Sequence, residues 1–299
     1  MAIFLAAAFP EKLGILGITT VAGNQVLEKT TINARKIVEL IGLNVPVAAG
    51  AAGPLARELA TGGFAHGETG MDGPELPEPA KACDGRHAAE FMASRIRSSP
   101  EPVAIVALGP LTNIALLLSV YPDVKERIAC ISLMGGAIAL GNMTAAAEFN
   151  IYVDPEAARI VFRSGVPLVM SGLDVTEKAL IFDSEIESLR HRGKVSRVAW
   201  KLLEYYSVYG RETLGMAGSA LHDPCAVAWL LRPDLFESEM LHVDVETAGE
   251  LTRGMTLADR RVRPEKPPNV RVLMNVDRKA FINLLMEALI IHDTLCYYK

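Results

Sequence analysis

The sequence has few of the features that mark nucleic-acid-binding or membrane proteins. Its 299 residues carry a formal net charge of −5 and no Lys/Arg cluster of the kind that binds nucleic acid, which argues against such a partner. No apolar run reaches the roughly 18 residues that a membrane span needs. The start, MAIFLAAAF, is apolar but lacks the basic region of a secretory signal peptide.

Cysteine is also scarce, and no cofactor fingerprint is present. The four cysteines are widely separated, without metal-site spacing: Cys83, Cys130, Cys225 and Cys296. We therefore expect buried free thiols in a reducing compartment, and a cytoplasmic protein. No G-x-G-x-x-G follows the first strand-like run, and VAGN lacks the required spacing, so a nucleotide-cofactor oxidoreductase is a weak alternative.

Strand-like apolar runs alternate with helical periodicity over the first ~230 residues. Strands are expected in GILGITTV, VPVAAG, PVAIVALG, IACISLMGG and VPLVMSGLDV, with helices between them and one long helical stretch over 183–213. This pattern predicts an α/β fold with an open, largely parallel, Rossmann-like sheet flanked by helices. After residue 240, three segments alternate like antiparallel strands, a β-rich C-terminal addition before a last helix. Since no linker-like break occurs, we expect a single domain over 1–299.

The stretch 134–154, MGGAIALGNMTAAAEFNIYVD, carries polar groups directly after an apolar strand. In an α/β sheet, residues just past the carboxyl end of a strand lie where small ligands bind. Two carboxamides and a carboxylate, Asn142, Asn150 and Glu148, suit a polyhydroxylated ligand such as a sugar, because they donate and accept hydrogen bonds to hydroxyl groups. The alternative is a polar loop that caps the next helix.

A second candidate is His222-Asp223-Pro224. A His beside an Asp at a helix start can be a proton donor next to a hard-metal ligand, but Asp-Pro before a helix is more often an N-cap, as we expect at Asp154. His66, in AHGETG, lies in a Gly-rich loop, where a lone His is usually solvated. The tyrosines within 205–209 either pack in the core or form a lid that stacks on a base.

Eight stretches, in the same order, resemble the inosine–uridine-type nucleoside hydrolases: GITTVAGN, PVAAGAAGPL, HGETGMDG, ALGPLTNIAL, LMGGAIALGNMTAAAEFNIYVDPEAA, GLDVT, LHDPCAVAWLL and VETAGELTRGMT. They are distributed over residues 17–256 of the chain. The resemblance implies a Rossmann-type α/β fold and hydrolysis of the N-glycosidic bond of ribonucleosides to ribose and a free base, with pyrimidine or broad preference. It also implies one bound Ca²⁺ and a homodimer or homotetramer.

The resemblance extends to individual site residues. Asn24, Asn142, Glu148 and Asn150 match positions that hold the ribose hydroxyls. In the implied mechanism, the bond to the base breaks through an oxocarbenium-like ribosyl cation. These residues would hold the sugar while that cation forms.

Four further positions match the metal and the base side. Asp223 and the main-chain carbonyl of Leu108 match Ca²⁺ ligands, and His222 matches a residue near the leaving base. His66 matches a His found on the base side in pyrimidine-preferring members. We expect Ca²⁺ to order a water and His222 to stabilise the departing base, with His66 assisting.

The sequence differs from the family pattern at its N-terminal end. The family opens with a strand and an Asp-rich loop, D-x-D-x-x-x-D-D, which supplies the general base and metal contacts, whereas Met1 here falls where the following helix has begun. Either the recorded start is an internal Met of a longer protein, or the chain is a catalytically impaired nucleoside- or ribose-binding protein. On either interpretation, we expect residues 1–299 alone to bind Ca²⁺ weakly and to hydrolyse nucleosides poorly or not at all.

Overall fold

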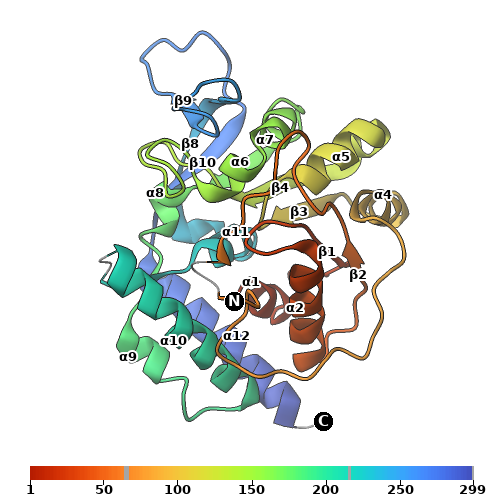
Figure 1. Cartoon of the computed structure of the whole chain (residues 1–299), viewed down its shortest axis with the longest axis vertical. Coiled ribbons are helices and arrows are strands. Elements are labelled where there is room, and N and C mark those ends of the chain that lie inside the picture. The colour runs from red at the N-terminus through yellow and green to blue at the C-terminus, as the bar shows by residue number, and fades with distance from the viewer. Residues whose placement is uncertain (64–66, 215–216, 298–299) are drawn as a thin grey trace.

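The computed structural model describes residues 1–63, 67–214 and 217–297 (Figure 1). Within this part of the chain, the main sheet has six strands in the order β3-β4-β5-β10-β8-β9. Their bounds are Val103–Ala107 (β3), Ile128–Met134 (β4), Leu168–Ser171 (β5), Val270–Val276 (β10), Phe236–Val245 (β8) and Thr256–Asp259 (β9). The first four pair in parallel, while β8 pairs antiparallel with β10 and β9. The predicted largely parallel α/β sheet is confirmed.

Two smaller sheets accompany the main one. β1 (Ile18–Thr20) pairs in parallel with β2 (Val47–Ala49), and β6 (Leu180–Ile181) pairs antiparallel with β7 (Ser219–Ala220). The buried side chain of Asn113 links the first of these sheets to the helix after β3. Its amide nitrogen donates to the carbonyl of Thr20 at 2.9 Å, and its oxygen accepts from the amide of Ala51 at 2.8 Å. This fixes the loop after β1, which carries Asn24.

Helices cover both faces of the main sheet (Figure 1). In chain order they are α1 (Ala2–Ala7), α2 (Leu27–Leu40), α4 (Ala88–Ser98), α5 (Thr112–Val120), α6 (Phe149–Val153), α7 (Pro155–Phe162), α8 (Leu173–Thr176), α9 (Asp183–Glu187), α10 (Lys194–Leu214), α11 (His222–Leu231) and α12 (Arg278–Tyr297). Strand β5 shows why both faces are covered. Leu168 and Met170 pack with α4, α5 and α7, whereas Val169 packs with α1, α11 and α12. Alternate side chains of one strand therefore enter opposite cores.

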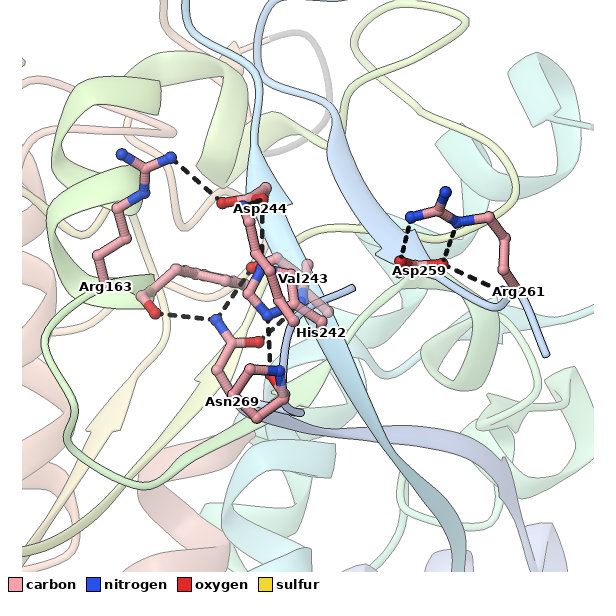
Figure 2. Close-up of polar contacts among 10 residues, drawn as sticks. Arg163, His242, Val243, Asp244, Asp259, Arg261 and Asn269 are labelled. Carbon is pink, nitrogen blue, oxygen red and sulfur yellow. Dashed lines mark hydrogen bonds and ion pairs between the residues drawn. The ribbon is translucent and has the colours of Figure 1, made fainter. Parts of the chain in front are cut away.

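The C-terminal strands are more closely integrated than expected. β10 pairs in parallel with β5, inside the main sheet, and sends apolar side chains into the cores on both faces. Figure 2 shows polar contacts that join β8 to the segment before β10 and to the end of α7. Asn269 donates to the carbonyls of Phe162 and Val243, and Asp244 forms an ion pair with Arg163 at 3.3 Å. The expected antiparallel pairing of the C-terminal strands is confirmed, and β10 in addition pairs in parallel with β5.

Two helix predictions also needed correction. The stretch 183–213 is two helices, α9 and α10, separated by residues 188–193. Asp223 is the second residue of α11 rather than its cap, whereas Asp154 caps α7 as expected, accepting from the amide of Ala157 at 3.0 Å. All four cysteines are free, but only Cys225 is fully buried.

No helix in the described part of the chain is both long and apolar enough to cross a membrane.

Candidate functional site

A cavity of about 600 Å³ opens at the carboxyl ends of the parallel strands, where Leu108 follows β3 and Met134 ends β4. It gathers residues from segments far apart in the sequence. Those that sequence analysis singled out and that line it are Asn24, Leu108, Asn142, Glu148, Asn150, His222 and Asp223. The remaining candidate, His66, lies outside the described residues.

A tight turn after β4 shapes one wall of the cavity. Gly136 has φ +78°, and a Cβ there would lie 2.9 Å from the hydroxyl of Thr256. That hydroxyl accepts from the amide of Ala137 at 2.9 Å and donates to its carbonyl at 2.6 Å. Only glycine lets the turn approach so closely, and the turn directs the amide of Gly136 at Glu148.

Glu148 is both a helix cap and a cavity residue. It is 2% exposed, and its Oε2 accepts from the amides of Gly136 at 2.9 Å and Ile151 at 3.2 Å, capping α6. The pKa of Glu148 is raised to about 7, mainly by burial. Hydrogen bonds from backbone amides oppose this rise, and the nearby charge of Asp223 adds a smaller contribution to it. The two interpretations of this residue, sugar contact and cap, are therefore compatible.

Two of the three asparagines that line the cavity are held by the backbone. Asn150 is 7% exposed and its amide nitrogen donates to the carbonyl of Met134 at 3.0 Å. The side-chain oxygen of Asn142 accepts from the amide of Phe149 at 2.9 Å. Asn24 is exposed to solvent in the loop after β1. The orientations of Asn142 and Asn150 are thus fixed before any ligand binds.

The start of α11 also lines the cavity. His222 is its first residue, and its Nδ1 lies 2.8 Å from the hydroxyl of Thr176. Burial raises the pKa of Asp223 to about 6, and the N-terminal ammonium of Met1 opposes that rise. Burial in turn lowers the pKa of that ammonium, with Asp223 acting against the shift. Met1 also lines the cavity, which the sequence analysis did not predict, because nothing local relates it to residues more than 200 positions away.

The cavity contains some of the oxygen ligands that a cation site needs. The carboxylate of Asp223 and the main chain of Leu108 both line the cavity, and oxygen atoms of these kinds are the ligands that Ca²⁺ prefers. Ca²⁺ takes six to eight oxygens. Among the described residues, no group of three or more His, Cys, Asp or Glu is arranged to hold a metal. The fit to Ca²⁺ is therefore one of donor chemistry rather than of a complete ligand set.

A largely apolar wall completes the cavity. Phe149 and the α10 residues Leu202, Leu203, Tyr205 and Tyr206 line it. Tyr205 is 41% exposed, which agrees with a lid position better than with core packing. Polar amides and carboxyls on one side and aromatic rings on the other suit a ligand that joins a hydroxylated ring to a flat heterocycle.

Glu177 is a further cavity residue that sequence analysis did not select. Burial, and secondarily the charge of Asp174, raise the pKa of Glu177. Asp174 itself does not line the cavity, and its carboxylate accepts from the amide of Ile138 at 2.8 Å.

Comparison with known proteins identifies relatives over nearly the whole chain. The model of the family described as inosine-uridine preferring nucleoside hydrolase matches residues 1–283. The chain is 50% identical, over 292 residues, to a pyrimidine-specific ribonucleoside hydrolase RihA from Citrobacter koseri, with 97% of this chain and 93% of that protein covered. It is also 50% identical to the protein of the same name from Photobacterium profundum, with 97% and 94% covered.

Solved structures agree with the fold. A purine-preferring ribonucleoside hydrolase from Gardnerella vaginalis superimposes with a TM-score of 0.91 at 31% identity, covering 98% of this chain and 95% of that one. An inosine-uridine preferring nucleoside hydrolase from Bacillus anthracis superimposes with a TM-score of 0.82 at 18% identity, covering 97% and 94%, and at that identity supports the fold alone.

Proposed function

The chain belongs to the inosine-uridine preferring nucleoside hydrolase family, and from this premise we propose that it hydrolyses the N-glycosidic bond of pyrimidine ribonucleosides such as uridine. The observation that carries the proposal is the single cavity into which Asn24, Asn142, Glu148, Asn150 and His222 converge. Pyrimidine preference is supported by the names of the relatives at 50% identity.

The polar wall would bind the ribose. Asn150 and Glu148 are buried and backbone-bonded, so they lose little conformational freedom when a sugar binds. Asn24 and Asn142 would contact further hydroxyl groups from the exposed rim of the cavity. Holding the hydroxyls in place favours the oxocarbenium-like transition state, in which positive charge develops at C1′.

The opposite wall would receive the base. Phe149, Tyr205 and Tyr206 offer apolar contact to a flat ring. As the bond breaks, its electron pair leaves with the base, which gains a proton from His222. Water adds its hydroxyl to C1′ and releases its other proton to solvent, from which His222 is reprotonated. We propose His222 as this donor and keep His66 as a base-side candidate.

Ca²⁺ would be held in part by Asp223 and by the carbonyl of Leu108. When bound, it would order a water and ribose hydroxyls. The pKa of Asp223, raised to about 6 by burial, is consistent with this role, because a buried carboxylate that faces a cavity gains most from a nearby cation.

The remaining expectations are proposals of the same kind. We infer one domain, since the family model runs without a break over residues 1–283. Four free cysteines suit a reducing compartment such as the cytoplasm. We also propose a homodimer or homotetramer that acts on a small-molecule ribonucleoside.

The decisive experiment measures release of free base from uridine, cytidine and inosine by the full chain in the presence of Ca²⁺. We expect turnover of uridine and cytidine to exceed that of inosine. Asn150→Ala should abolish most of it, while Asn275→Ala, at an exposed asparagine outside the cavity, should not. Uridine binding without release of uracil would instead support a binding protein, and faster turnover of inosine would overturn the base preference.

A further inference from the structure

Thr176 is buried and contacts His222, which lines the cavity. It is 0% exposed, ends the short helix α8, and does not line the cavity. Its hydroxyl lies 2.8 Å from Nδ1 of His222, which does line it. The contact joins elements 46 residues apart in the sequence.

We propose that Thr176 is a positioning residue for the hydrolysis proposed above: its hydroxyl holds the His222 ring by Nδ1 and presents Nε2 to the leaving base. The proposal rests on that proposed function. It adds a residue that never touches the substrate and acts only through the proton donor.

The chemistry of the partner supports this role. A proton donor must pass through two protonation states in each turnover, and a hydroxyl can bond to the ring in both of them. When His222 gives the proton on Nε2 to the base, the hydrogen on Nδ1 stays in place, so the hydroxyl of Thr176 accepts from Nδ1 before and after the transfer. The neutral imidazole that remains carries its hydrogen on Nδ1 and has a bare Nε2, the nitrogen that takes up the next proton.

His242 offers a contrast within the same chain. Its ring lies between the carbonyl of Pro267, 2.8 Å from Nδ1, and the carboxylate of Asp244, 3.2 Å from Nε2 (Figure 2). Both of these partners only accept hydrogen bonds. His242 is therefore held at both ring nitrogens and does not line the cavity, whereas the contact with Thr176 is at Nδ1 of a ring that does.

Local structure explains how Thr176 is held. Its amide donates to the carbonyl of Gly172 at 3.0 Å, which closes the single turn of α8. The amide of Leu173 donates to the carbonyl of Gly136 at 2.9 Å, linking the same turn to the loop after β4. Thr176 thus sits on backbone that is fixed to the sugar-binding side of the cavity.

The test compares substrates with poor and good leaving groups. Thr176→Val keeps the side-chain volume but removes the hydroxyl. We expect it to lower kcat for uridine by about tenfold or more, with little change in KM. This loss is smaller than the full gain from general-acid catalysis, roughly 10²–10⁴-fold, because His222 itself is kept. The rate for p-nitrophenyl riboside should hardly change, since that leaving group needs no proton. Thr176→Ser should restore most of the uridine rate.

Thr31→Val is the matched control. Thr31 is also buried, and its hydroxyl bonds to that of Thr20 at 2.7 Å, outside the cavity lining. It should leave the ratio of the two substrate rates unchanged. Equal losses on both substrates in Thr176→Val, or a wild-type uridine rate, would overturn the proposal. Should Thr176→Val fail to fold by circular dichroism, Thr176→Ala takes its place.

A measurement independent of turnover separates this proposal from the proposed function. The ¹⁵N chemical shifts of the His222 ring, assigned with His222→Gln, report which ring nitrogen carries the hydrogen. We expect one dominant form in the wild type and a mixture in Thr176→Val. Identical ring signals in both would refute the positioning role, whereas a wild-type chain that leaves uridine intact would refute only the proposed function.

Discussion

Replacing Glu148 by Gln should make the chain more stable at high pH and change little at low pH. In the folded chain, burial raises the pKa of Glu148 to about 7 from an ordinary value of 4.5. The folded state therefore holds this proton more tightly than the unfolded state. The resulting stability is fully present below pH 4.5 and is lost as the pH rises towards 7.

The magnitude follows from the two pKa values. Between pH 5 and pH 8 the wild type should lose about 2.5 kcal/mol of unfolding free energy through this group. Glutamine cannot ionise, yet its side-chain oxygen can still accept from the amides of Gly136 and Ile151. The unfolding free energy of Glu148→Gln minus that of the wild type should therefore rise by about 2.5 kcal/mol over this range.

Urea denaturation at pH 5, 6.5 and 8 in Ca²⁺-free buffer would measure this difference. Glu246→Gln provides a control without pH dependence in this range, because hydrogen bonds from the amides of Ala248 and Gly249 lower the pKa of Glu246 and the carboxyl stays ionised from pH 5 to pH 8. A difference between Glu148→Gln and the wild type that stays constant over the three pH values would refute the reasoning. It would mean that the carboxyl is hydrated or neutralised by a partner in the fold.

Three further predictions concern activity. Asn150→Ala should lower the free energy of unfolding by about 1 kcal/mol, because the hydrogen bond to Met134 is lost, but should reduce uridine turnover far more. Losses of the same size in urea denaturation and in kinetics would contradict the ribose role. His222→Ala should slow uridine hydrolysis while sparing p-nitrophenyl riboside, and an equal loss on both would make His222 structural. Asp223→Asn should weaken Ca²⁺ binding measured by calorimetry at pH 7.5, where an Asp with a pKa of about 6 is ionised. An unchanged affinity would mean that Asp223 is not a Ca²⁺ ligand.

Hydrophobic periodicity in the sequence determined most of the elements. The α/β alternation and the helices α2, α4 and α7 follow from local apolar spacing, and Asp154-Pro155 marks the start of α7. The stretch 134–154 also pointed to its own polar residues, since Asn142, Glu148 and Asn150 lie within one loop and helix start. These features depend on neighbours in the chain, so the sequence carries them directly.

Pairings between distant segments were decided only by the tertiary structure. β10 joins the main sheet beside β5, where both strands send apolar side chains into the cores on both faces, and its alternating pattern gave no sign of a parallel partner. Likewise, the contact between Thr176 and His222 and the approach of the Met1 ammonium to Asp223 each join residues far apart in the chain. The pKa values at the site arise from burial, which only the folded chain creates. Local pattern thus selects the residues of this site, and long-range packing sets their chemistry.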